Sequence, residues 1–123
     1  IDGRKVVQNV ELSQLPYPSL NEINFTSFGE VTEEYHDELY SYLYSNKTDE
    51  VRWIEEYING KPTVNYIREL QNGSTKEEQK TLTEKIRHQI HHPENCHNAP
   101  YTEADIRQSI EDMRTFIMNK RES

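Results

Sequence analysis

One arginine and three histidines lie close together at residues 87–92, which read Arg-His-Gln-Ile-His-His. The guanidinium of arginine is a planar fork of donors that fixes a phosphate, and imidazole takes up or releases a proton near neutral pH. Together the two groups suit cleavage of a phosphodiester, one to stabilise charge on the phosphate and one to move a proton. We therefore take Arg87 and His92 as the candidate catalytic pair.

The spacing within this pair places it at the end of a helix. In a regular helix, positions five apart point roughly 140° away from each other, so Arg87 and His92 would diverge. Pro93 relaxes this restriction, because the residue before a proline is pushed out of α geometry and the ring of His92 can then turn back toward Arg87. His91 lies four residues after Arg87, shares its helical face and competes with His92 for the role of proton carrier.

Several residues near Arg87 and His92 are candidates for supporting roles, and the whole group also has a simpler, non-catalytic interpretation. The supporting candidates are His88, His91 and Asn95, and by proximity alone the loop residues His97 and Asn98. In the simpler interpretation the arginine pairs with a glutamate three residues earlier or favours the helix C-terminus through its charge. The histidines would then only be solvated or bond the free carbonyls of that helix end.

A second pattern in the same region is typical of metal ligands. Four histidines and Cys96 lie between residues 88 and 97, and imidazole and thiolate both suit zinc or nickel. Structural zinc sites typically join two distant pairs of ligands, and the chain has no second cluster of this kind. We therefore expect no bound metal and no other cofactor.

Length, composition and charge limit the possible classes of protein. A chain of 123 residues has room for one domain, and with 33% hydrophobic and 29% charged residues its core must be thin. The eight tyrosines suit a subunit interface, which favours a homodimer, although they can equally complete a small core. A net charge of −8 argues against broad binding of duplex DNA. The single cysteine fits a reducing compartment, here taken as the cytoplasm, and no segment is apolar enough to span a membrane.

Hydrophobic periodicity predicts an all-α fold, an up-and-down bundle of about five helices at residues 30–120. Pro16 and Pro18 interrupt the short alternating pattern that precedes it, so residues 1–29 are expected to form an extended arm. The helices are expected over about residues 30–46, 48–60, 62–70, 74–91 and 102–120. Pro93 ends the fourth, and Thr102 with Asp105 begins the last.

With these elements in place, the run at residues 87–92 resembles the Arg-polar-three residues-His motif of the HEPN superfamily of small helical domains. The resemblance covers roughly residues 30–120. It implies a metal-independent endoribonuclease of a toxin or antiviral defence system, in which His92 assists attack by a ribose 2′-hydroxyl and Arg87 stabilises the developing charge. It also implies a site built from two subunits, with RNA as substrate and an antitoxin or ATPase as a possible partner.

The alternative interpretation is a catalytically silent module of the same kind, which dimerises or docks onto a larger ATPase or toxin partner. A further similarity, to the C-terminal helical tails of bacterial defence ATPases, favours such a role. In that interpretation the histidines are incidental or only stabilise a helix end.

Overall fold

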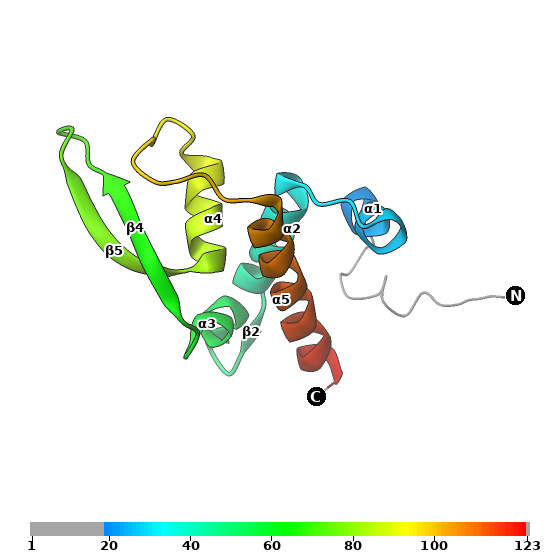
Figure 1. Ribbon diagram of the computed structural model, residues 1–123. Helices are drawn as coiled ribbons and strands as arrows, with labels where there is room; N and C mark the ends of the chain where they lie inside the picture. The colour runs from blue at the N-terminus through cyan, green and yellow to red at the C-terminus, as the bar shows by residue number, and fades with distance from the viewer. Residues whose placement is uncertain (1–18, 123) are drawn as a thin grey trace, which may run out of the picture.

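The computed structural model describes residues 19–122, which form five helices and two two-stranded antiparallel sheets (Figure 1). The helices are α1 (Leu20–Phe28), α2 (Glu33–Ser45), α3 (Trp53–Ile58), α4 (Leu82–His91) and α5 (Glu103–Glu122), and the strands are β2 (Lys47–Thr48), β3 (Val51–Arg52), β4 (Thr63–Glu69) and β5 (Thr75–Thr81). The predicted all-α fold is therefore wrong, because helices and strands are mixed. No helix among residues 19–122 is long and apolar enough to cross a membrane.

The largest correction concerns residues 63–81, which were expected to be helical. Strands β4 and β5 pair in register from Thr63 opposite Thr81 to Glu69 opposite Thr75. The turn between them is closed by Gly73, whose φ of 88° suits a residue without a side chain. Asn-Gly between two short runs is a hairpin signal, and here it joins strands rather than ending a helix.

A smaller hairpin replaces the expected beginning of the second helix. Strands β2 and β3 pair antiparallel through a two-residue loop, Asp49 and Glu50, and both residues have positive φ, as the tight turns of two-residue hairpins require. Helix α3 then starts only at Trp53. The expected start of this helix at about residue 48 is therefore wrong.

Helix α1 lies where the end of an extended arm was expected. Ser19 caps it by accepting a hydrogen bond from the backbone N–H of Glu22, and Gly29 ends it with a φ of 69°. Residues 20–28 are therefore helical. The rest of the expected arm, residues 1–18, lies outside the described residues.

Several predicted helix boundaries are confirmed. At the start of α5 the backbone N–H of Thr102 donates to the carboxylate of Asp105, and the backbone N–H of Asp105 donates to the hydroxyl of Thr102. Helix α4 ends at His91. The start of α4 is not where it was predicted, because its capping box is made by Thr81 and Glu84. Pro93 and the pair Thr102 and Asp105 thus located two helix ends, whereas the capping box at the start of α4 was not identified from the sequence.

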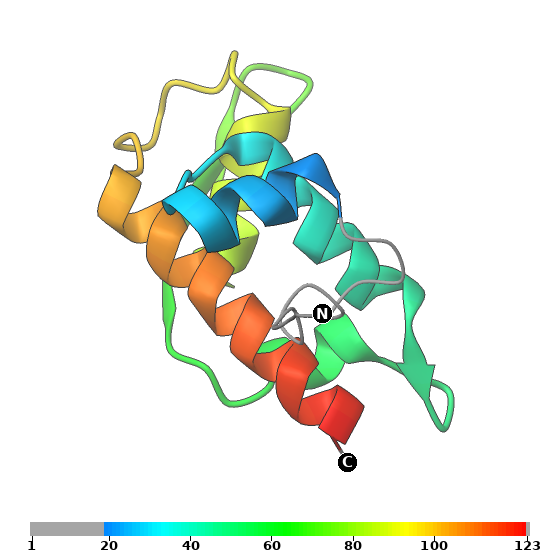
Figure 2. The ribbon, with the colours of Figure 1, turned by 90° about the vertical axis from the view of Figure 1, so that its right-hand side faces the viewer.

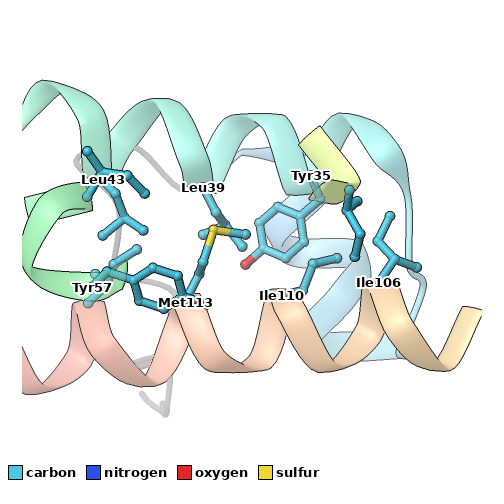
Figure 3. Packing of buried hydrophobic residues seen from close by; sticks show 10 residues of the cluster. Tyr35, Leu39, Leu43, Tyr57, Ile106, Ile110 and Met113 are labelled. Atoms are coloured by element: carbon cyan, nitrogen blue, oxygen red, sulfur yellow. The ribbon is translucent and has the colours of Figure 1, made fainter. Parts of the chain in front are cut away.

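The core lies mainly between α2 and α5, with α3 and α4 closing its sides. Figure 3 shows Tyr35 and Leu39 of α2 facing Ile110 and Met113 of α5. The two helices run side by side in the same direction, as Figure 2 also shows, so the arrangement is not a simple up-and-down bundle. The remaining fully buried hydrophobic side chains are Leu43, Ile86 and Ile117.

A buried chain of polar groups crosses this core and joins four helices. Nε2 of His36 lies 2.7 Å from the hydroxyl of Ser109, which lies 2.7 Å from that of Thr83, which in turn lies 2.8 Å from that of Tyr57. Burial first and the charge of Arg87 second lower the pKa of His36 to about 4, so this imidazole is neutral at pH 7. Because His36 and Ser109 are fully buried, we assign the chain a structural role.

Candidate functional site

The candidate site lies at the C-terminal end of α4, on the side that faces α2. His92 follows the last helical residue with φ −130° and ψ 65°, and its backbone N–H still bonds the carbonyl of His88. It has therefore left α geometry, as Pro93 predicts. This departure removes the geometric objection to Arg87 and His92 sharing a site.

Both members of the predicted pair line one open groove between α2 and α4, with a volume of about 560 Å³. The groove is lined by hydroxyl, aromatic and imidazole groups, together with one carboxylate and one guanidinium. Its residues are Tyr40, Ser41, Tyr44, Ser45, Glu84, Arg87, His88, His91 and His92. Arg87 and all three histidines of residues 87–92 are thus brought together, and Asn95 lies outside this groove.

Arg87 is held against an aromatic ring of α2. Its guanidinium carbon lies 4.1 Å from the centre of the Tyr40 ring, a cation–π contact that leaves the edge donors of the fork able to meet a ligand. Glu84, the expected ion-pair partner in the simpler interpretation, instead accepts hydrogen bonds from the backbone and hydroxyl of Thr81. Burial raises the pKa of Tyr40, and the charge of Arg87 opposes that shift.

His92 is paired with a carboxylate two residues later. Its Nδ1 lies 3.2 Å from Oε2 of Glu94, and 55% of its side chain is exposed. A hydrogen bond from its own backbone N–H and another from His92 hold the pKa of Glu94 below its usual value. When Nδ1 donates to the carboxylate, Nε2 is left as the proton-accepting nitrogen, which is the tautomer that a general base needs.

His91 has a different partner, although it is adjacent in sequence. Its Nε2 lies 3.0 Å from Oδ2 of Asp37, so this histidine bridges α4 to α2. His91 and His92 are thus each paired with a carboxylate, His91 with one on α2 and His92 with one in the loop that follows α4.

His88 lies between two other rings. Its ring centre is 5.2 Å from that of Tyr66 and 6.5 Å from that of His92, at interplanar angles of 23° and 24°. Burial lowers the pKa of His88, and the charges of Lys80 and Arg68 lower it further. This imidazole therefore loses its proton more readily than a free one, and its ring lies beside that of His92.

Asn95 and Asn98 bind the backbone of strand β4. The side-chain amides of both donate to the carbonyl oxygen of Ile67, and the side-chain oxygen of Asn98 accepts from the N–H of Ile67 at 2.8 Å. Asn95 also donates to the hydroxyl of Tyr66. These bonds fix the loop that carries Glu94, so both asparagines support the site through loop position rather than by facing the groove.

A second, smaller cavity of about 310 Å³ lies between the β4–β5 hairpin and the end of α4. It shares His88 and His92 with the groove, so the two hollows meet at these rings. Its other lining residues are Tyr66, Arg68, Glu69, Glu94 and Asn95.

The metal-ligand pattern does not come together in the described part of the chain. Among residues 19–122, no three histidine, cysteine, aspartate or glutamate side chains are grouped as a metal ion requires. Cys96 is exposed and its thiol donates to the carbonyl of Glu94, while His97 lies 3.9 Å from a carboxylate oxygen of Glu69. These two potential metal ligands, Cys96 and His97, therefore contact different groups.

Comparison with protein-family models, with curated proteins and with solved structures finds no match to this chain.

Sequence reasoning missed four residues that shape the site: Tyr40, Tyr66, Glu94 and Asp37. Only Glu94 carried a local signal, as a carboxylate two residues after a histidine. The other three meet the site through packing of α2 and β4 against α4, which periodicity alone does not show.

Proposed function

We propose that the groove between α2 and α4 binds single-stranded RNA and cleaves it without a metal ion. The observation that carries the proposal is that Arg87 and His92 line the same open groove, with Nδ1 of His92 held by Glu94. The proposal keeps the chemistry implied by the Arg-polar-three residues-His motif and does not include an all-α fold.

In the proposed reaction, Nε2 of His92 removes the proton from a ribose 2′-hydroxyl. The 2′-oxygen attacks the adjacent phosphorus, the bond from phosphorus to the 5′-oxygen breaks, and a 2′,3′-cyclic phosphate forms. The guanidinium of Arg87 stabilises the negative charge that accumulates on the phosphate oxygens. Glu94 holds the imidazole in position and stabilises its protonated form.

The departing 5′-oxygen needs a proton from a second group. Within one chain the ring of His88 lies beside that of His92, and burial and the charges of Lys80 and Arg68 lower the pKa of His88. A lowered pKa reduces the fraction of imidazole that carries a proton to donate at pH 7. The proposal therefore includes a homodimer, in which the His92 of a second copy supplies this proton.

Single-stranded RNA is the substrate class that fits the charge and the lining. A net charge of −8 opposes the long-range attraction that duplex binding relies on, whereas a short single strand needs only local contacts. Tyr44, 51% exposed, offers the groove an aromatic face, and Ser41 and Ser45 offer hydroxyl groups. The proposal places this activity in the cytoplasm, where single-stranded RNA is available.

The test is cleavage of a labelled single-stranded RNA in the presence of a chelator by the wild-type protein and three variants. Arg87→Ala and His92→Ala should each reduce cleavage by on the order of a hundredfold or more, because each removes a group that acts on the reacting atoms. His91→Ala is the matched control and should keep most activity. Cleavage that chelation abolishes, or equal loss in all three variants, contradicts the proposal.

One observation favours a second candidate function, a non-catalytic interaction module that docks onto a larger partner. Arg87 stacks on Tyr40 and His91 bridges to Asp37, so two residues of the motif also hold α4 against α2. On α1, Leu20 and Phe28 are 72% and 79% exposed and are available for a partner. A wild-type protein that cleaves no RNA, with an Arg87→Ala variant that loses only stability, would support this function.

A further inference from the structure

The β4–β5 hairpin has two faces of different charge, because side chains alternate along each strand. On one face Tyr66 is opposite Glu78, Arg68 opposite Lys76 and Val64 opposite Lys80. On the other face Ile67 is opposite Glu77, Glu69 opposite Thr75 and Asn65 opposite Gln79. All three basic residues of β4 and β5 therefore lie on the face that carries Tyr66. We call Arg68, Lys76 and Lys80 the basic face.

The basic face surrounds a single carboxylate. Oxygens of Glu78 lie 3.5 Å from the guanidinium of Arg68, 4.0 Å from the ammonium of Lys76 and 3.7 Å from that of Lys80. Three positive charges against one negative charge leave a formal excess of two positive charges. Such an excess is unusual for a chain whose net charge is −8.

The basic face adjoins the candidate site. Figure 1 shows the hairpin beside α4, and the ring of Tyr66 stacks on that of His88. Arg68 lines the smaller cavity, which meets the groove at His88 and His92. A polymer that occupies the groove and passes over the end of α4 therefore arrives at this face of the hairpin.

We infer that the basic face binds the stretch of single-stranded RNA that extends from the groove past His92, with Arg68 and Lys76 as its phosphate contacts. This inference rests on the proposed function of the groove and names the surface that holds the flanking part of its substrate. The side chains of Arg68 and Lys76 are 45% and 64% exposed, so both reach a ligand without rearrangement. The side chain of Lys80 is 23% exposed, and it contributes to RNA binding mainly through the electrostatic attraction of its positive charge.

A purely structural role explains only part of this arrangement. One cation is sufficient to neutralise Glu78, and cross-strand pairing normally avoids like charges directly opposite each other. Arg68 and Lys76 nevertheless occupy directly opposite positions. The single carboxylate of Glu78 lies near both side chains and offsets part of their repulsion, and a bound phosphate would offset more of it.

Two adjacent glutamates provide a matched pair of test variants. Glu78→Gln removes the carboxylate inside the basic face, and Glu77→Gln removes one from the opposite face, so both raise the net charge equally. Binding is measured by fluorescence anisotropy with a single-stranded RNA that is 2′-O-methylated throughout and cannot be cleaved by 2′-hydroxyl attack. Glu78→Gln should tighten binding by about threefold or more, and Glu77→Gln should leave it nearly unchanged. Equal effects of the two variants overturn the inference.

The phosphate contacts themselves are tested by Arg68→Gln combined with Lys76→Gln. Binding should weaken by about tenfold or more, and the slope of log affinity against log salt should fall by about 0.7 for each lost contact. The control combines Lys47→Gln with Arg107→Gln, which changes the net charge equally on other elements and should have little effect. Circular dichroism shows whether each variant folds, and a folded Arg68/Lys76 variant with an unchanged slope overturns the inference.

Failure of this inference is distinguishable from failure of the proposed function. A protein that cleaves RNA but shows no difference between Glu78→Gln and Glu77→Gln keeps its proposed function and loses the basic face as a binding surface. A protein that binds the methylated RNA with the expected differences but cleaves no unmodified RNA keeps the basic face and loses the nuclease activity.

Discussion

His92 and Glu94 form a hydrogen-bonded pair just beyond the end of α4, with 3.2 Å between Nδ1 and Oε2. The pair exists because Pro93 ends the helix, so the chain turns between the two residues and brings the carboxylate back to the ring. A histidine whose Nδ1 faces a carboxylate presents Nε2 to the solvent. The use of Nδ1 distinguishes His92 from His91 and His97, which face carboxylates through Nε2.

Glu94→Gln should slow RNA cleavage. The neutral amide cannot accept the charge-assisted hydrogen bond that stabilises the protonated imidazole of His92, so proton transfer becomes less favourable. The rate at neutral pH should fall by up to about tenfold in cleavage of a labelled single-stranded RNA. Glu103→Gln, at an exposed position of α5, is the control. A Glu94→Gln rate equal to that of the control would show that this pair does not act in the reaction.

Two helix ends were predictable from local signals in the sequence, whereas the capping box of Thr81 and Glu84 at the start of α4 was not identified. Pro93 fixed the end of α4, and Thr102 with Asp105 fixed the start of α5. The β4–β5 hairpin was not predicted because Val64, Ile67 and Leu70 recur at helical spacing and β5 is rich in lysine, glutamate and glutamine, which favour helices. Pairing across the turn at Gly73, and packing of Tyr66 on His88, override those local preferences.

The candidate site was predictable in its residue types but not in their partners. Arg87 and His92 follow from the spacing of the motif and from the proline. The contacts with Tyr40 and Asp37 depend on the packing of α2 against α4, which lie about fifty residues apart in sequence. Local sequence therefore named the candidate groups, and tertiary structure added the partner of each histidine.

Glu22 should make the folded protein less stable as pH rises. Its side chain is fully buried, and burial raises its pKa to about 7 despite the opposing charge of Arg114. The folded state therefore holds the proton more tightly than the unfolded chain, whose pKa is about 4.5, so stability falls between about pH 4.5 and 7. Glu22→Gln should be more stable than wild type at pH 8 by on the order of 2 kcal/mol, and similar to it at pH 4, in urea unfolding. A variant that is destabilised equally at both pH values contradicts this account.

His36 should have the opposite effect on stability. Burial lowers its pKa to about 4, so the unfolded chain, with a pKa of 6.5, binds the proton more tightly, and stability rises between about pH 4 and 6.5. In wild type this rise is partly cancelled by Glu22. Urea unfolding of Glu22→Gln across this range should therefore show a steeper increase with pH than wild type. A flat curve for the variant would mean that His36 is protonated without cost in the folded state.

A homodimer is expected because the reaction needs a second proton-transfer group. Light scattering at micromolar concentration should give about twice the chain mass of 14.7 kDa. Mixing the inactive His92→Ala variant with wild-type protein should lower the activity of the wild-type chains by more than dilution alone. The reason is that a mixed dimer has only one of the two His92 side chains that the reaction needs. A clean monomer that still cleaves RNA contradicts the composite site and assigns the second proton to a group within one chain.

The most direct measurement is the chemical identity of the ends that cleavage produces, determined by mass spectrometry of a defined single-stranded RNA digested in chelator. Attack by the 2′-hydroxyl at a site formed by Arg87 and His92 predicts 2′,3′-cyclic phosphate and 5′-hydroxyl ends, and one 2′-deoxynucleotide at the cleavage position should block the reaction. Products with 5′-phosphate and 3′-hydroxyl ends, or no cleavage by the folded wild-type protein, would contradict the account.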